Sequence, residues 1–241
     1  MLAPALPAGV LLVVWTAVGW AVGLALNHVA YQIPSDLSPI SAPRCPACHA
    51  RIPILRLVQR RCERCGAPLE YDRIEWITAV CFLLLGVHVG QTALLLVYSF
   101  YTAVLVLTAI MDMRHRYIYS LVSYPSIAAA MVLSPTVGGL DIATTGAGVA
   151  TALAIFVAFY VGGRLAYPGR EPVGKGDIEL AAMIGAMTGF PRVVSALFLG
   201  SFVNGFVIAL LLLTGRRRRM DFVPYGPGLC LGAYAALFMS P

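Results

Sequence analysis

Two aspartates at the ends of apolar stretches are the residues of this sequence best suited to catalysis. Asp112 closes one stretch in Ala-Ile-Met-Asp-Met-Arg, and Asp177 opens another in Gly-Lys-Gly-Asp. Ionisable side chains at the ends of membrane spans are costly and by default indicate function. Two carboxyl groups that lie close together share a proton, so one can activate water while the other polarises a carbonyl group. This pairing predicts the general acid–base chemistry of peptide hydrolysis.

Each aspartate also has a simpler interpretation. Asp112 can pair with Arg114 or Arg116, and Asp177 can cap the N-terminus of a helix. The string Gly-Lys-Gly-Asp is short, so it gains weight only from a second acid at the same membrane face. Glu179 follows Asp177 by two residues. Positions i and i+2 of a helix point to different faces, so we expect Glu179 to have only a modest electrostatic effect on Asp177.

Four cysteines form a second group, with the spacing of metal ligands. They stand in two CxxC pairs: Cys45, Cys48, Cys62 and Cys65. Four thiolates at this spacing close a tetrahedron around Zn²⁺ and leave no position for water. The sequence therefore predicts a structural zinc site, in which Gly66 eases the second turn. Two disulfides or free thiols are the alternatives, and a cytoplasmic location disfavours disulfides.

The composition indicates a membrane protein. Apolar residues make up 59% of the chain, charged residues only 12%, and the mean hydropathy is +0.82; soluble domains have about 25% charged residues. We predict an all-α, polytopic membrane protein with about eight transmembrane helices and a small zinc-knuckle cytoplasmic loop. The predicted spans are residues 5–30, 74–90, 92–112, 118–135, 142–163, 178–190, 193–214 and 225–240.

The basic residues predict the orientation of these spans. With eight spans, all seventeen lysines and arginines except Arg192 fall on one side, and the positive-inside rule makes that side cytoplasmic. Both termini are then outside, and Asp112 and Asp177 lie at the cytoplasmic face. The net charge of +6 resides in short loops, so we expect membrane lipid and not nucleic acid as a partner. The run Arg216–Arg219 is expected to anchor the topology, and contact with anionic lipid headgroups is its other interpretation. The first basic residue is Arg44, so the first apolar stretch is expected to be a retained span.

Some polar and small residues within the apolar stretches have structural interpretations. Asn27 and Asn204 are expected to form hydrogen bonds between helices. Close helix packing is the expected role of four glycines: Gly146, Gly148, Gly185 and Gly189. Cys81 and Cys230 are expected to be ordinary packing residues.

The order of these motifs resembles that of the type IV prepilin peptidases. The segment from Asn27 to Pro34, Asn-His-Val-Ala-Tyr-Gln-Ile-Pro, is similar to the N-V-x-x-Y-R-x-P opening of that family. The paired CxxC loop, an aspartate at the end of a span and GxGD follow in the family's order. Pro-Tyr-Gly-Pro at residues 224–227 is similar to the family's last turn. Together these motifs run across nearly the whole chain, from about residue 19 to residue 235.

The resemblance implies a membrane-embedded aspartyl endopeptidase of the inner membrane, with Asp112 and Asp177 as its catalytic residues. Members remove the short basic leader of type IV prepilins and pseudopilins. Many also methylate the new N-terminus with S-adenosylmethionine, an activity associated with the cysteine-bearing loop. We accordingly divide the chain into residues 1–73, the first span plus the four-cysteine loop and a methyltransferase region, and residues 74–241, the peptidase domain.

The sequence departs from the family at several positions. The segment between the CxxC pairs is short and lacks the Trp-Tyr-Asp-Asn-Ile-Pro of bifunctional members, and Gln32 replaces the arginine of the opening motif. Tyr119 replaces the usual proline after Asp112. Glu75 matches the family's acidic residue at the second span and is a weak candidate for cofactor binding. These departures put the methyltransferase activity in doubt more than the peptidase activity.

Three other functions compete with this interpretation. A presenilin-type intramembrane protease shares GxGD, but its acids lie in mid-span and it lacks the cysteine loop. A proton-coupled transporter also uses paired acids, but we find no internal repeat or broken helix in the sequence. A non-catalytic, zinc-bearing membrane scaffold for pilus or secretion assembly is the alternative from another functional class.

Overall fold

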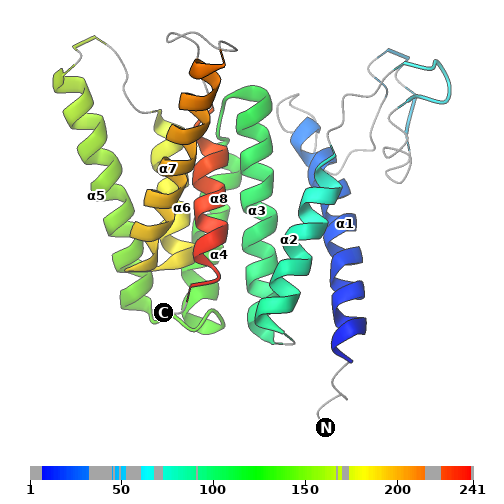
Figure 1. Cartoon of the computed structure of the whole chain (residues 1–241), viewed down its shortest axis with the longest axis horizontal. Coiled ribbons are helices and arrows are strands. Elements are labelled where there is room, and N and C mark those ends of the chain that lie inside the picture. The colour runs from blue at the N-terminus through cyan, green and yellow to red at the C-terminus, as the bar shows by residue number, and fades with distance from the viewer. Residues whose placement is uncertain are drawn as a thin grey trace. The chain divides into compact units, whose positions relative to one another are not determined.

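The chain folds into α-helices. The computed structural model describes residues 7–32, 45, 47–48, 50–52, 61–67, 73–90, 92–166, 168–169, 174–214 and 224–239. Within these ranges there are eight α-helices and no β-strand, which confirms the predicted all-α class for this part of the chain (Figure 1). The helices are α1 (Ala8–Gln32), α2 (Ile74–Val89), α3 (Ala93–His115), α4 (Ser120–Thr136), α5 (Ile142–Ala166), α6 (Lys175–Thr188), α7 (Arg192–Leu213) and α8 (Gly226–Ala236).

Each predicted apolar stretch corresponds to one helix, with boundaries that differ by at most four residues, and two of these differences concern the aspartates. Helix α3 continues three residues beyond Asp112, and α6 begins two residues before Asp177. Both acids are therefore held on helical backbone, Asp112 in the last turn of α3 and Asp177 in the first turn of α6. Their backbone positions are fixed by helical hydrogen bonds instead of by loops.

Four helices are long and apolar enough to cross a membrane: α1, α3, α5 and α7. Helix α2 is apolar but shorter. Apolar segments in helices satisfy their own backbone hydrogen bonds, which a bilayer interior requires. The structure thus supports several spans among the described residues, whereas the count of about eight stays a prediction.

The chain divides into two compact units, Met1–Leu95 and Leu96–Pro241. In the first unit, α1 packs against α2 through glycines. A Cβ atom on Gly19 would lie 2.6 Å from Cβ of Phe82, and one on Gly23 would lie 2.5 Å from Cα of Glu75, so only glycine allows this approach. The predicted functional boundary at residue 73 concerns activities and stays a prediction.

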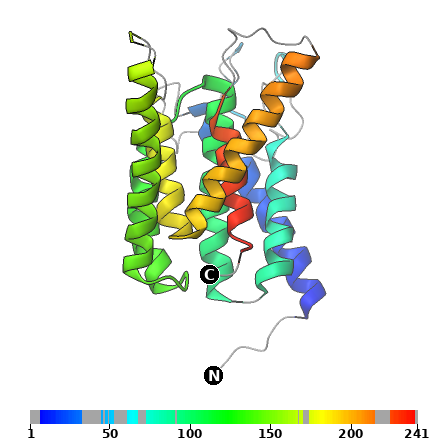
Figure 2. The ribbon, with the colours of Figure 1, turned by 60° about the vertical axis from the view of Figure 1, so that its left-hand side comes forward.

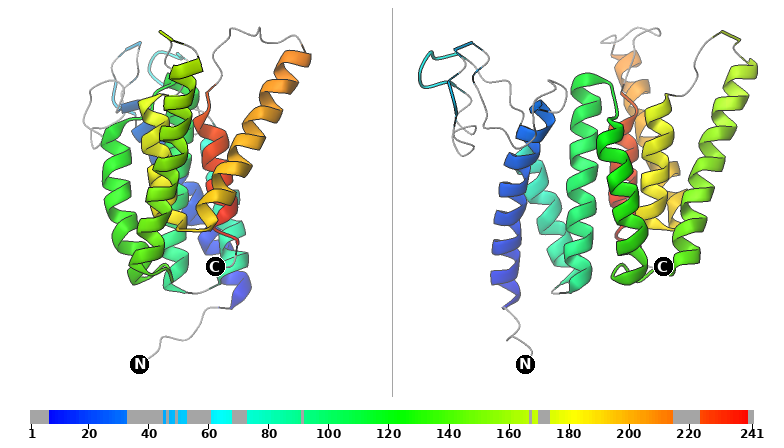
Figure 3. Two further views of the ribbon diagram at one scale, coloured as in Figure 1. Left: turned by 90° about the vertical axis from the view of Figure 1, so that its left-hand side faces the viewer. Right: turned by 180° about the vertical axis from the view of Figure 1, so that it is seen from behind.

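In the second unit, α6 packs between α4 and α5 (Figure 3), and α8 lies along α7 (Figure 2). The backbones of α5 and α6 meet at Gly148 and Gly185, where a Cβ on Gly185 would lie 2.7 Å from the Gly148 carbonyl carbon. Gly189 ends α6 with a φ of 66° and packs against Leu140. The expected packing role is confirmed for these three glycines. It is wrong for Gly146, which has nothing within 4 Å of a Cβ position, because it faces away from α6.

Buried hydrogen bonds connect α3, which carries Asp112, to α6, which carries Asp177, through α4. The Tyr101 hydroxyl of α3 lies 2.7 Å from Oγ of Ser134 in α4, and Ser134 Oγ donates to the Ala186 carbonyl of α6 at 2.8 Å. Both side chains are at most 1% exposed. Buried polar groups that are fully paired fix the position of one helix against another. The predicted arginine run Arg216–Arg219 lies outside the described residues.

Candidate active site and four-cysteine cluster

Asp112 is buried at the end of α3 and bonded to the start of α8. Its side chain is only 6% exposed, and its Oδ2 atom accepts a hydrogen bond of 2.8 Å from the Gly226 N–H. Gly226 is the first residue of α8, and the first N–H groups of a helix have no partner within the helix. The Asp112 carboxylate therefore provides the acceptor for an N–H group that has no partner within α8.

Asp177 lies in the first turn of α6 and is half-buried. The Gly174 N–H donates a hydrogen bond to its carboxylate, and the Asp112 carboxylate is near enough to repel it electrostatically. The start of α6 also packs on the segment that follows α3, since a Cβ on Gly176 would lie 2.9 Å from Cβ of Ile118. Two acids sixty-five positions apart in the sequence are thus neighbours in the second unit.

The peptide group that contacts Asp112 is itself held by α7. Asn204 Nδ2 donates to the Tyr225 carbonyl of this peptide at 2.7 Å. Separately from the peptide, the Tyr225 side-chain hydroxyl donates to Ser201 Oγ at 2.6 Å. The expected role of Asn204 in hydrogen bonding between helices is therefore confirmed. Helices α7 and α8 can lie close enough for these bonds because Gly200 has no side chain. A Cβ on Gly200 would lie 2.7 Å from Cα of Leu229.

Glu179 points away from the two aspartates, as its position on the helix predicts. Its Oε1 atom accepts hydrogen bonds from Ser120 Oγ at 2.9 Å and from the Tyr124 hydroxyl at 3.2 Å. Both donors belong to α4. Glu179 therefore connects α6 to α4 about half a turn along the helix from Asp177.

Sequence analysis missed two groups beside Asp112. One is the Gly226 N–H, which reaches Asp112 from 114 positions away in the sequence. The other is Cys230, interpreted from sequence as an ordinary packing residue, which is buried one turn further along α8 and near enough to interact electrostatically with Asp112. The available signal was the Pro-Tyr-Gly-Pro turn, which indicates a family but not the contact that its glycine makes.

The four predicted ligand cysteines converge in the first unit. Their sulfur atoms all lie within 4.8 Å of one another, with Cys45–Cys65 and Cys48–Cys62 sulfur distances of 3.6 Å. A tetrahedron with metal–sulfur bonds of about 2.3 Å has sulfur separations of roughly 3.8 Å, whereas a disulfide requires about 2.05 Å. The cluster therefore fits a four-coordinate metal ion, and all four cysteines are free of disulfides.

The backbone around the cysteines also suits thiolate ligands. The predicted turn at Gly66 has a φ of 71°. The N–H groups of Cys65 and Arg64 lower the pKa of Cys62 to about 6. The Ala67 N–H lowers the pKa of Cys65, but desolvation and the other three sulfurs raise it to about 12. Four adjacent thiols thus do not all ionise near neutral pH without a cation.

The surroundings of the cluster supply positive charge. Arg51, Arg61 and Arg64 line a cavity of about 320 Å³ beside Cys62, which also has one acid, Glu63, in its wall. Four thiolates around a divalent cation carry a net charge of −2, which these guanidinium groups can offset. A structural metal centre is consistent with both the distances and the charges.

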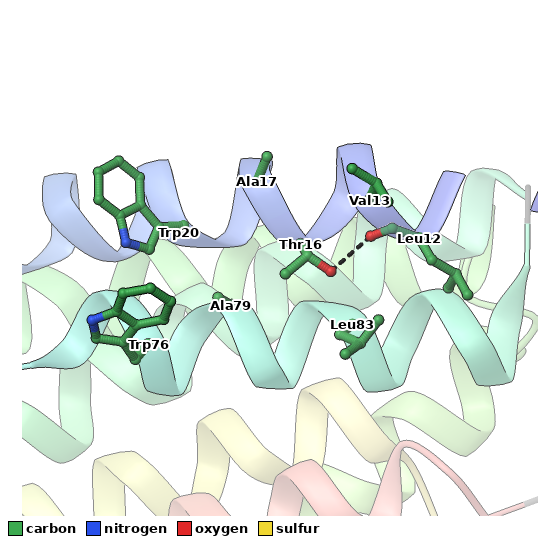
Figure 4. Close-up of a pocket in the computed structure, with 8 residues that line it drawn as sticks. All are labelled: Leu12, Val13, Thr16, Ala17, Trp20, Trp76, Ala79 and Leu83. Atoms are coloured by element: carbon green, nitrogen blue, oxygen red, sulfur yellow. Dashed lines mark hydrogen bonds between the residues drawn. The ribbon is translucent and has the colours of Figure 1, made fainter. Parts of the chain in front are cut away.

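A groove between α1 and α2 has no group suited to chemistry. It is a space of about 540 Å³ lined by Leu12, Val13, Thr16, Ala17, Trp20, Trp76, Ala79 and Leu83 (Figure 4). Its hydroxyl group, on Thr16, donates to the Leu12 carbonyl at 2.7 Å. Glu75, the weak cofactor-binding candidate, is 3% exposed and packs on Gly23.

Comparison with known proteins identifies the family. Residues 99–210 match the type IV leader peptidase family. The chain is 30% identical to a prepilin leader peptidase/N-methyltransferase of Bacillus subtilis, over 89% of this chain and 90% of that protein. Proteins of the same name match from Myxococcus xanthus (30% identity, 82% of this chain, 62% of that protein) and Legionella pneumophila (26%, 90% and 88%). No solved structure matches the chain. With these motifs and relatives, and with helices as the regular elements of its described residues, the chain belongs to the type IV leader peptidase family of proteases.

Proposed function

We propose that this protein is a membrane-embedded aspartyl endopeptidase, with Asp112 and Asp177 as its catalytic pair, that removes the leader of type IV prepilins or pseudopilins. The observation that carries the proposal is the proximity of these two acids at adjoining helix ends. The names of the relatives supply the substrate class. A single acid would serve as a helix cap, whereas two acids that share a site are suited to activating water.

The proposed reaction needs one proton between the two carboxyl groups. The ionised carboxylate takes a proton from a water molecule, whose oxygen attacks the scissile carbonyl carbon while the protonated acid donates to the carbonyl oxygen. The tetrahedral intermediate then collapses: the carbon–nitrogen bond breaks, the amine leaves with a proton from the pair, and a hydroxyl of the intermediate returns a proton to the other carboxylate. The Gly226 N–H holds Oδ2 of Asp112 as an acceptor, which leaves Oδ1 as the oxygen that exchanges protons.

The predicted orientation suits such a substrate. We place the two acids at the cytoplasmic face of the inner membrane and both termini outside, with about eight spans, because the basic residues segregate to one side. A substrate with a basic cytoplasmic leader and an apolar helix in the bilayer presents its cleavage site at that depth. Arg192 is the exception to the charge count. Its side chain is buried, and its guanidinium donates a hydrogen bond of 3.3 Å to the Met239 carbonyl.

We propose that the four-cysteine cluster holds a structural Zn²⁺. Four sulfur ligands and the sulfur spacing favour zinc over harder cations. When bound, the ion would fix the loop, where, among the described residues, buried Ile52 and partly buried Ala67 pack with the cysteines.

Substitution of each acid tests the peptidase. Purified protein in detergent is mixed with a prepilin-like substrate, and wild type is compared with Asp112→Asn and Asp177→Asn. Either change is expected to reduce cleavage by at least about 10³-fold, since neither amide can exchange the proton. The matched control is Asp141→Asn, because Asp141 accepts a 2.9 Å bond from the Thr144 N–H at the start of α5 and asparagine caps equally well. Full cleavage by either active-site variant contradicts the proposal.

Methylation of the new N-terminus is a second candidate activity. The relatives carry N-methyltransferase in their names, and the cysteine cluster associated with that activity is present. Cleaved product is incubated with S-adenosylmethionine, and mass spectrometry looks for a gain of one methyl group. Glu75→Gln is expected to reduce methylation and to leave cleavage intact. A product that stays unmethylated with wild type rejects this activity.

The same assay tests the alternative function. A non-catalytic, zinc-bearing scaffold for pilus or secretion assembly would bind a prepilin and release no leader. The scaffold account and the peptidase account therefore differ in one measurement on the wild-type protein.

A further inference from the structure

Between Asn204 and Asp112 runs a continuous path of two hydrogen bonds through a single peptide group. The Tyr225 carbonyl and the Gly226 N–H are the two ends of the peptide bond that joins these residues. Asn204 Nδ2 donates to the carbonyl end at 2.7 Å, and the N–H end donates to Asp112 Oδ2 at 2.8 Å. The path thus links the middle of α7 to the end of α3 across the start of α8.

From this path we infer that Asn204 is a positioning residue for Asp112. The inference rests on the proposed catalytic role of Asp112 and adds to it the device that orients this carboxylate. Asn204 does not reach the carboxylate itself, so it acts through the Tyr225–Gly226 peptide.

Two physical effects give Asn204 this influence. A peptide that accepts a hydrogen bond at its oxygen is polarised, which strengthens the bond that its N–H donates. The same bond fixes the rotation of the peptide plane, so the N–H keeps its direction toward Oδ2. Asn204 and Gly226 are buried, so loss of the amide removes a hydrogen-bond partner of the Tyr225 carbonyl and leaves the peptide freer to reorient.

The packing around Asn204 shows that this amide is held in one place. Its side chain is 7% exposed. Gly228 faces it so closely that a Cβ there would overlap the amide group. Catalytic groups depend on such support, because a displacement of about 1 Å costs on the order of a hundredfold in rate.

Ser201 provides a matched control on the same helix. It lies three positions before Asn204 and accepts the 2.6 Å bond from the Tyr225 hydroxyl. Ser201→Ala therefore removes a bond between α7 and the same tyrosine without touching the Tyr225–Gly226 peptide. A merely structural role of Asn204 predicts similar effects for both positions, whereas positioning predicts different ones.

Leader cleavage supplies the first test. Asn204→Ala, which cannot crowd Gly228, and Asn204→Leu, which is close in size, are each expected to lower kcat at least about tenfold, with KM within twofold of wild type. The acid limb of the pH–rate profile is expected to move to higher pH, because an N–H bond favours the ionised carboxylate. Ser201→Ala is expected to stay within threefold with an unmoved profile. Asn204 variants that match Ser201→Ala in kcat and profile overturn the inference.

Thermal denaturation supplies a second test that does not depend on activity. Asn204→Ala is expected to lower the apparent Tm by about 2–4 °C. In an Asp112→Ala background, which lacks the acceptor, it is expected to lower it by less than half as much, whereas Ser201→Ala has equal effects in both backgrounds. Additive effects of Asn204→Ala and Asp112→Ala overturn the coupling. If wild type cleaves no prepilin, the proposed function fails, and this cycle alone still decides the coupling.

Discussion

The four-cysteine cluster and the two-aspartate site depend on sequence in different ways. The cluster assembles from two CxxC pairs, and the cysteines whose sulfur atoms lie 3.6 Å apart are at most 20 positions apart in the sequence. The aspartate site joins the end of α3, the start of α6 and the start of α8, with one contact spanning 114 positions. Local chain geometry almost suffices for the cluster, whereas the acid pair exists only when several helices pack correctly. The geometry of the two-aspartate site should therefore be far more sensitive than that of the cluster to substitutions elsewhere in the chain.

Apart from replacement of the acids themselves, the largest effect is expected from the glycine that contacts Asp112. A Cβ on Gly226 would lie 2.7 Å from Asp112 Oδ2, so Gly226→Ala must displace the carboxylate or the start of α8. We expect cleavage to fall about a hundredfold, which corresponds to about 2.7 kcal/mol in the activation free energy. The measurement is kcat/KM for a prepilin-like substrate.

Gly205→Ala is the control for that substitution. Gly205 also lies in the second unit, on α7 next to Asn204, and a Cβ there meets nothing within 4 Å. Its activity should equal that of wild type. Equal activity of Gly226→Ala and Gly205→Ala would show that the α8 contact has no part in cleavage.

The sequence predicted the helices well because their signal is local. Apolar stretches of the right length located all eight described helices to within a few residues, since a lipid solvent leaves the backbone little choice. The cysteine cluster was predicted for the same reason: its turns are set by residues adjacent to the ligands, such as Gly66.

The support of the acid pair could not be predicted, because it depends on packing between distant segments. The sequence named Asp112 and Asp177 but gave no indication that the Gly226 N–H would reach Asp112 or that Asn204 would hold the same peptide. Neither glycine backbone nor a lone asparagine has a pattern that indicates a partner. Gly146 illustrates the same limit, because helix periodicity alone did not decide which glycines of α5 face α6.

A smaller effect is expected where α5 and α6 meet. Gly185→Ala would place a Cβ 2.5 Å from the Gly148 carbonyl oxygen and 2.7 Å from its carbon. Overpacking of this kind typically costs about 1–3 kcal/mol of stability. We expect the apparent Tm to fall by several degrees, together with a few-fold loss of cleavage because α6 carries Asp177. Gly146→Ala on the same helix pair should be neutral or slightly stabilising, since alanine favours helices. An equal fall in Tm for Gly146→Ala would instead show that the close approach of Gly185 to Gly148 is not the cause of the loss.

The smallest effect on cleavage is expected from the loss of the metal ligands. Cys62→Ser removes one of four sulfurs that lie within 4.8 Å of one another, and the metal content measured by elemental analysis should fall from about one ion per chain to near zero. Cys81→Ser, in the middle of α2, should keep its metal. Cleavage by Cys62→Ser should change by less than about fivefold, because the loop cysteines belong to the first compact unit and both acids to the second.

This last comparison separates a local fold from a shared one. If the cluster only stabilises its own loop, metal loss abolishes any methylation and leaves the acid pair working. A loss of cleavage as large as that of Gly226→Ala would mean that the metal-bearing loop takes part in peptide hydrolysis, for instance by binding the leader. Substrate titration then distinguishes the two causes: a binding role raises KM, whereas a displaced carboxylate lowers kcat. Whether KM or kcat changes in Cys62→Ser therefore decides whether the cysteine cluster and the acid pair act separately.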